Sequence, residues 1–198
     1  MSIFQQYTQQ LSDALQNLDQ TTFDHLAEQL FDLWLARKRL FICGNGGSAG
    51  NAIHIANDFT YGINPNGLAL DVEALPANSA VMTCLANDIG YQNVFAHQLK
   101  VKAQTGDVLL VLSGSGNSAN IIQALQQAKL CGMTSYAIVG FDGGKAAKMA
   151  DHVIHANVQD MQISEDIQVI IGHMLMKSLY QAISQYQQDT LDFPSVRA

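Results

Sequence analysis

The strongest constraint on the fold is an alternation that begins at Leu40. Short apolar runs end in glycine, serine or aspartate, and stretches with helical spacing of apolar residues separate them. This pattern is typical of a parallel sheet covered by helices on both faces. It predicts an α/β fold, a three-layer sandwich with a five-stranded parallel sheet, whose strands lie at 40–43, 68–72, 108–112, 136–139 and 152–154. Helices are expected near 48–60, 79–86, 91–103, 117–131 and 163–187.

A helical N-terminal extension precedes this alternation. Apolar residues recur there at helical spacing in two groups, Phe4 to Leu18 and Phe23 to Trp34, on either side of a turn. A chain of 198 residues suits one domain of ordinary size. We therefore expect a single domain over 1–198, made of N-terminal helices at 1–38, a parallel α/β core at 39–160 and a long C-terminal helix at 161–188.

Charge and composition exclude several classes of protein. The formal net charge is −7, and the one basic run, at 37–39, suits a helix end, so no nucleic-acid partner is expected. No apolar stretch reaches the length of a membrane span, and no secretory signal opens the chain, so we expect a cytoplasmic protein without a membrane partner. The odd number of cysteines (Cys43, Cys84 and Cys131), all in apolar surroundings, predicts reduced core thiols.

Two loops of small residues follow the first and third predicted strands. They read Gly44-Asn45-Gly46-Gly47-Ser48-Ala49 and Ser113-Gly114-Ser115-Gly116-Asn117-Ser118. Glycine lets the backbone approach a ligand, and the free N–H groups and dipole of a helix start favour an anion. Ligands of such sheets bind beyond the carboxyl ends of the strands. The candidate phosphate-binding hydroxyls are Ser48, Ser113, Ser115 and Ser118.

The first loop also fits a dinucleotide fingerprint. Gly44, Gly46 and Ala49 match G-x-G-x-x-G/A, and Asp71 closes the next predicted strand. Two features count against this alternative. The second loop is rich in hydroxyl groups, which a dinucleotide fold does not require, and the helix after the first loop carries His54 and Asp58.

Ionisable side chains gather on two predicted helices. His54 and Asp58 are four residues apart and share a face, while Glu165 and His173 are eight apart. Two imidazoles and two carboxylates suit a divalent metal such as zinc, or general acid–base work, although a lone helical histidine is more often a core residue. Eight residues of helix span about 12 Å. We therefore expect a second subunit to bring Glu165 or His173 to the site.

Taken in order, these motifs resemble the sugar isomerase (SIS) domain family, and within it the isomerases of sedoheptulose 7-phosphate. The motifs are Cys43 to Ser48, His54, Ala86 to Asp88, Gly106 to Leu110, and Ser113 to Asn120. The resemblance implies a flavodoxin-like α/β fold, and a homotetramer with active sites at subunit interfaces. It implies that the serines hold phosphate and that Asn45, Gly46, Asn87 and Asp88 lie near the sugar. It places zinc-binding and acid–base positions on His54, Asp58, Glu165 and His173.

The activity that the resemblance implies is aldose–ketose isomerisation of a phosphorylated sugar through an enediol(ate). Asp58 or Glu165 would remove the proton beside the carbonyl, and His173 would move a proton between oxygens or back to carbon. Three positions depart from the family pattern, which has glutamate at Asp58, glutamine at Glu165 and arginine at Gly62. They leave open a different sugar phosphate, or a non-catalytic tetrameric scaffold that binds a replication initiator or another protein. Retention of both histidines with carboxylate partners favours catalysis.

The surface composition fits this expectation. The chain has few charges but 20 glutamines, many of them near its two ends. Because charge is depleted at the centre of interfaces, the terminal helices are candidate subunit contacts. A phosphate held by hydroxyls, backbone amides and helix starts needs no basic pocket, so we expect an anion site without basic side chains.

Overall fold

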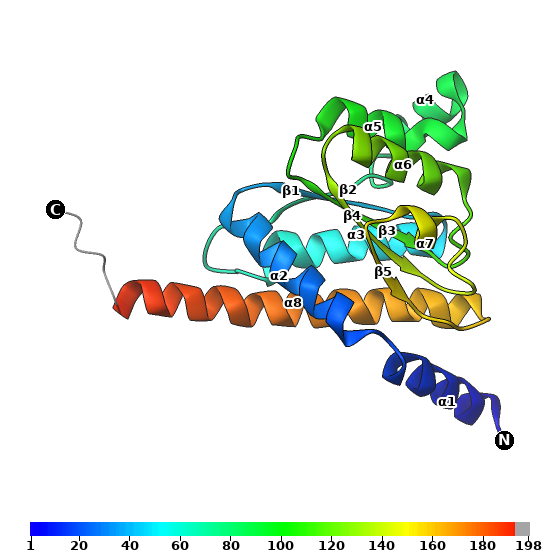
Figure 1. Ribbon diagram of the computed structural model, residues 1–198, viewed down its shortest axis with the longest axis horizontal. Helices are drawn as coiled ribbons and strands as arrows, with labels where there is room; N and C mark the ends of the chain where they lie inside the picture. The colour runs from blue at the N-terminus through cyan, green and yellow to red at the C-terminus, as the bar shows by residue number, and fades with distance from the viewer. Residues whose placement is uncertain (193–198) are drawn as a thin grey trace.

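The computed structural model describes residues 1–192 and contains a five-stranded sheet, all of whose strands are parallel, in the order β2-β1-β3-β4-β5. Figure 1 shows this sheet between two layers of helices. The α/β sandwich with five parallel strands, and its flavodoxin-like order, is confirmed. The strands are β1 (Arg39–Cys43), β2 (Asp71–Ala74), β3 (Val108–Ser113), β4 (Thr134–Val139) and β5 (His152–His155).

The helices divide between the two faces of the sheet. On one face lie α2 (Gln20–Leu35), α3 (Gly47–Asn57) with the π-helical turn η1 (Asp58–Gly62), and α8 (Met161–Asp192). The other face carries α4 (Ser79–Ile89), the 3-10 turn η2 (Tyr91–Asn93), α5 (Val94–Lys102), α6 (Ala119–Leu130) and α7 (Ala146–Met149). The first helix, α1 (Ile3–Gln16), lies beyond the sheet against the start of α8.

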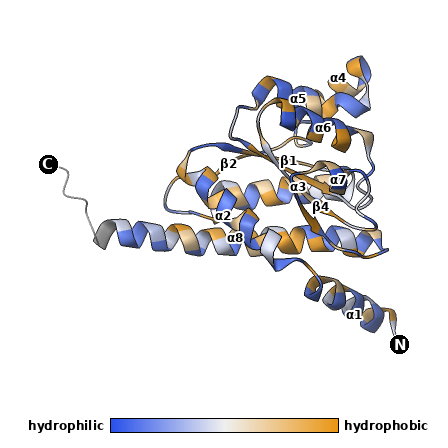
Figure 2. Ribbon diagram, viewed as in Figure 1, coloured by the Kyte–Doolittle hydropathy of each residue, from blue (hydrophilic) through white to orange (hydrophobic). Residues whose placement is uncertain are grey.

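Alternation along the strands produces two hydrophobic cores. Leu40 and Ile42 pack in the core under α2, α3 and α8, whereas Phe41 and Cys43 pack in the core under α5 and α6. This follows from the period of two in a strand, which sends successive side chains to opposite faces. Because both faces are covered, every residue of β3 is buried. Figure 2 shows the resulting hydrophobic positions along the strands and the inner sides of the helices.

The predicted second strand was placed too early. Residues 68–70 precede β2 and make other contacts: the Leu68 carbonyl accepts from Trp34 Nε1 at 2.7 Å, and Leu70 N–H donates to the Phe59 carbonyl. The strand begins at Asp71, whose carboxylate pairs with Arg39 at the start of β1. Asp71 therefore opens β2 instead of closing it, and it lies at the amino edge of the sheet, away from the glycine loops.

The local sequence pattern did not predict the π-helical turn η1 or the short helix α7. The predicted helix 48–60 changes at Asp58 into the π-helical turn η1, and α7 was not predicted. Of the three predicted core thiols, Cys43 is buried, which raises its pKa, but Cys84 is exposed and Cys131 is half-buried. All three are free. Cys84 lies on the outer side of α4, whereas Cys131 follows the end of α6 and packs partly against the core under α5 and α6.

The N-terminal helical extension is confirmed as α1 and α2, and the long C-terminal helix as α8. Tyr7 of α1 donates a hydrogen bond of 2.6 Å to Asp166 of α8, which raises the pKa of Tyr7 to about 12. Through residue 192, none of the helices is both long and apolar enough to cross a membrane. The division into parts at 1–38, 39–160 and 161–188 stays a prediction, and the end of the predicted domain, 193–198, lies outside the described residues.

Candidate active site

The first glycine loop joins β1 to α3 at the carboxyl edge of the sheet. Gly44 is required there because a Cβ at this position would lie 2.6 Å from the Ser48 carbonyl oxygen. Gly46, at φ +55°, takes a left-handed conformation that glycine adopts without strain and caps α3. The chain thus turns sharply and presents the backbone of Gly46 and Gly47 at the start of a helix, with Ser48 buried behind them.

The second loop joins β3 to α6, and its serines shape the loop itself. Ser113 Oγ accepts from the N–H of Gly116 at 3.1 Å, and Ser115 Oγ accepts from Asn117 at 3.3 Å. Ser118 is the residue before α6 and makes no side-chain cap to that helix. Its hydroxyl therefore leaves the first two N–H groups of α6, those of Ala119 and Asn120, to another acceptor, as an anion site at a helix start requires.

The remaining predicted sugar contacts occupy two places. Asn45, in the first loop, forms hydrogen bonds with Asn120 of α6 and with Tyr91 of η2. Asn87 and Asp88 lie on the last turn of α4 and bond to each other, Nδ2 to Oδ1, at 2.7 Å. Sequence reasoning did not single out Tyr91, and it quoted Asn120 only within a motif, because their contacts to Asn45 cross 46 and 75 residues of chain.

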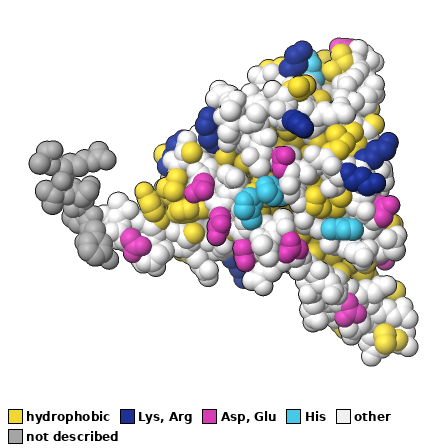
Figure 3. Space-filling model, in the orientation of Figure 1, with side chains coloured by type: hydrophobic (Ala, Val, Ile, Leu, Met, Phe, Trp, Pro, Cys, Tyr) yellow, Lys and Arg dark blue, Asp and Glu magenta, His cyan; other side chains and the backbone are white. Residues whose placement is uncertain are grey.

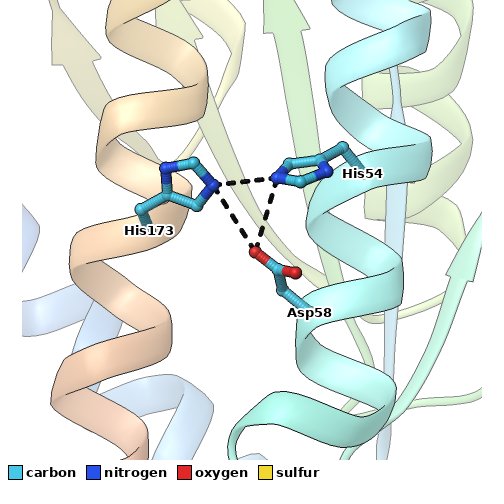
Figure 4. Close-up of side chains that lie close together, drawn as sticks. All are labelled: His54, Asp58 and His173. Atoms are coloured by element: carbon cyan, nitrogen blue, oxygen red, sulfur yellow. Dashed lines mark hydrogen bonds and ion pairs between the residues drawn. The ribbon is translucent and has the colours of Figure 1, made fainter.

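Three of the four predicted metal-binding residues converge (Figure 4). His54 Nε2 and His173 Nε2 are 2.8 Å apart, and Asp58 Oδ2 lies 3.5 Å from the first and 3.6 Å from the second. His54 comes from α3, Asp58 from the start of η1 and His173 from α8. Within residues 1–192 this is the one group of three or more His, Cys, Asp or Glu side chains arranged to hold a metal ion.

This group lies open to solvent in one direction. The histidine side chains are 47% and 50% exposed, whereas Asp58 is 17% exposed and lies beneath them. On the face of the molecule that Figure 3 draws, histidine side chains lie near the centre with acidic side chains around them. A small molecule can therefore reach both imidazoles while the Asp58 carboxylate stays partly shielded.

Glu165, the fourth predicted ligand, lies elsewhere within this chain. It stands two turns before His173 on the continuous helix α8, and its carboxylate lies against Gly47 of the first loop. A Cβ at Gly47 would come within 2.6 Å of all three carboxyl-group atoms. One chain therefore does not assemble the four-residue metal set, for the geometric reason expected: a straight helix cannot bring both residues to one ion.

The close approach of α3 and α8 depends on Gly172. A Cβ there would lie 2.5 Å from Ile55 Cγ1, and Asn51 of α3 donates to the Glu165 carbonyl at 2.8 Å. His173 follows Gly172 directly, so this contact sets how near the imidazole of His173 comes to that of His54.

Replacing Gly172 with alanine is expected to lower the free energy of unfolding by about 1–3 kcal/mol, the usual cost of overpacking a core. Urea denaturation measures this change. Gly50→Ala is the matched control, because a Cβ at that helical position has no atom within 4 Å and should stabilise α3 slightly. Equal free energies of unfolding for the two variants would show that α3 and α8 can move apart without loss of stability.

A flavodoxin-like sheet order, two small-residue loops at its carboxyl edge and a histidine–carboxylate group between α3 and α8 together define a class of sugar-phosphate proteins. Residues 4–140 match the family model described as SIS domain. The chain belongs to the SIS domain family.

Relatives within that family are named phosphoheptose isomerases. The chain is 38% identical to the phosphoheptose isomerase of Sulfurimonas denitrificans, over 72% of this chain and 73% of that protein. It is 31% identical to that of Aneurinibacillus thermoaerophilus, over 81% of each. The structure of a phosphoheptose isomerase from Neisseria gonorrhoeae superposes with a TM-score of 0.80 at 29% identity, covering 89% of this chain and 94% of that one.

The acidic residue assigned to the dinucleotide alternative, Asp71, lies at the wrong end of its strand. In that motif an acidic residue ends the second strand and binds a ribose. Asp71 instead begins β2 and pairs with Arg39 at 2.9 Å, at the opposite edge of the sheet from the glycine loops.

Proposed function

We propose that this protein is a phosphosugar isomerase that converts sedoheptulose 7-phosphate to D-glycero-D-manno-heptose 7-phosphate. The observation that carries the proposal is the convergence of two imidazoles and a carboxylate on one exposed point, in a chain whose relatives are named phosphoheptose isomerases. An aldose–ketose isomerisation moves one proton between neighbouring carbons and another between their oxygens. It therefore needs a base beside groups that bind the oxygens.

The phosphate is proposed to bind across the starts of α3 and α6. Backbone N–H groups of Gly46 and Gly47 and the hydroxyls of Ser48, Ser113, Ser115 and Ser118 are its donors. Neither loop contains a lysine or arginine, so charge is balanced by helix dipoles and hydrogen bonds. Fixing the phosphate in this way holds the sugar in one register relative to the ionisable group.

Asp58 is proposed as the base that removes the proton from the carbon next to the carbonyl. When no ion occupies these atoms, its Oδ2 has both imidazoles within 3.6 Å, so a proton accepted there can pass to a neighbouring nitrogen. His173 then moves the proton between the two substrate oxygens or returns it to carbon. Glu165 stays the alternative base if a second subunit presents it to the sugar.

The donor atoms fit a divalent metal. Two imidazole nitrogens and one carboxylate oxygen within 4.8 Å of one another form the three-ligand set of catalytic zinc sites, with a fourth position left for substrate. His54, Asp58 and His173 would hold the ion. When bound, it would polarise the substrate carbonyl and stabilise the developing oxyanion.

We also propose a homotetramer with active sites at subunit interfaces. His173 of the site lies on the terminal helix α8, and Glu165 belongs to the predicted set but lies apart from the site within one chain. Apolar residues of the terminal helices face outward: Ile3 and Phe4 are each 77% exposed on α1, and Tyr180 is 48% exposed on α8. A second copy that covers these helices would also approach the site.

The test is a panel of sugar phosphates assayed with purified protein, with metal content and sedimentation measured on the same sample. We expect turnover of sedoheptulose 7-phosphate above that of hexose and amino-sugar phosphates, bound divalent metal and a tetrameric mass. Turnover of none of the panel would reject an isomerase. A fully active monomer would reject the shared site.

A further inference from the structure

Three polar side chains from three separate elements meet over the crevice between β1 and β3. Asn45 follows β1, Asn120 lies in the first turn of α6, and Tyr91 begins η2. The two amides bond reciprocally at 2.8 Å, each Nδ2 to the other Oδ1, and the Tyr91 hydroxyl donates to Asn45 Oδ1 at 2.7 Å. The chain reverses its direction of strand addition between β1 and β3, which is where such sheets bind ligands.

A backbone group fixes the orientation of both amides. Ile121 N–H donates to Asn120 Oδ1 at 3.0 Å, and a backbone N–H can only donate. Asn120 must therefore direct its Oδ1 toward Ile121 and Asn45 Nδ2, and its own Nδ2 toward Asn45 Oδ1. Asn120 is only 2% exposed, so water cannot replace these partners. The Ile121 N–H also donates to the Ser118 carbonyl, but the reversed arrangement of the two amides would place the Asn120 Nδ2 donor against the Ile121 N–H donor.

This orientation decides what Asn45 and Tyr91 offer to a ligand. Asn45 Oδ1 already accepts two hydrogen bonds, while its Nδ2 donates, among the described residues, only to Asn120 and retains a second hydrogen. The Tyr91 proton is engaged, but its oxygen keeps lone pairs, and the residue is 52% exposed. A donor and an acceptor thus stand side by side at the crevice.

Such a pair matches a hydroxyl group. A hydroxyl accepts and donates at once, whereas a phosphate dianion only accepts and would be repelled by the phenol lone pairs. We propose that Tyr91 and Asn45 together bind a hydroxyl of the sugar, with Asn120 as the positioning residue that aims Asn45. This inference rests on the proposed function, because it names how that site recognises the sugar part of its substrate.

The test compares affinities of Tyr91→Phe and the wild-type protein for sedoheptulose 7-phosphate and for inorganic phosphate, by titration calorimetry. Loss of one hydrogen bond to the sugar is expected to raise the Kd of the sugar phosphate about threefold to tenfold. The Kd of inorganic phosphate should not change. Tyr186→Phe is the control, since that tyrosine is 44% exposed but lies on α8 against Phe31 and Trp34, outside this network.

Four results would overturn the inference. The first two are an unchanged Kd of the sugar phosphate in Tyr91→Phe and an equal rise for both ligands in that variant. The other two are the same rise in Tyr186→Phe, and wild-type protein that binds the sugar phosphate no more tightly than inorganic phosphate. Turnover by the wild type is measured separately. Absence of turnover would reject the proposed function. The ratio of the Kd of the sugar phosphate to the Kd of inorganic phosphate would still decide whether Tyr91 and Asn45 bind a hydroxyl group.

Discussion

Replacing Asp58 with asparagine is expected to lower kcat about 100-fold to 10,000-fold, the range for loss of a positioned general base. The amide has nearly the shape of the carboxylate, so it can keep its place beneath the two imidazoles. It cannot accept the proton that isomerisation removes from carbon. Steady-state kinetics with sedoheptulose 7-phosphate measure the effect, and circular dichroism confirms that the fold is retained.

Glu165→Gln is the matched comparison, because it also converts a carboxylate to an amide on the same side of the sheet. Glu165 lies against Gly47, in the loop proposed for phosphate, so its removal should chiefly lower KM by relieving repulsion of the anion. A collapse of kcat in Glu165→Gln, with Asp58→Asn still active, would assign the base to Glu165 and show that a neighbouring subunit completes the site.

The sheet was predictable because its strands are buried on both faces. The runs 108–112 and 136–139 are continuously apolar, and the observed strands β3 and β4 exceed them by only a few residues. The second strand was misplaced because Leu68 and Leu70 are as apolar as strand residues. Leu70 instead packs in the core under α2, α3 and α8, whereas the Leu68 side chain is 71% exposed, and the backbone of both residues bonds to α2 and η1, which the local pattern does not reveal.

The site was predictable in its parts but not in its assembly. Helical spacing put His54 and Asp58 on one face, yet nothing local showed that His173 would join them, across 119 residues from His54. Gly172 permits the close contact between α3 and α8. A glycine within a helical pattern does not by itself indicate that another helix packs against it. The partners of Asn45 were missed for the same reason, since side-chain hydrogen bonds between elements far apart in the chain produce no periodic pattern in the sequence.

The double variant His54→Ala/His173→Ala is expected to reduce turnover at least about 1,000-fold, because it removes an acid–base group and two of the three candidate metal ligands together. Both side chains are about half exposed, so their truncation opens no core cavity and the fold should persist. Bound metal, measured on the purified variant, should fall with turnover.

Loss of turnover separates an enzyme from a scaffold in this experiment, and binding of inorganic phosphate shows that the rest of the site is intact. The proposed phosphate site lies on the loops at the starts of α3 and α6, so the double variant should retain its affinity for inorganic phosphate while losing turnover. His97→Ala is the control, because His97 is an exposed histidine on α5, outside the metal-binding group. If the double variant matched the wild-type protein in turnover and in metal content, the paired histidines would have no catalytic role. Absence of turnover in the wild-type protein as well would favour the non-catalytic alternative for a chain that keeps the fold and the glycine loops.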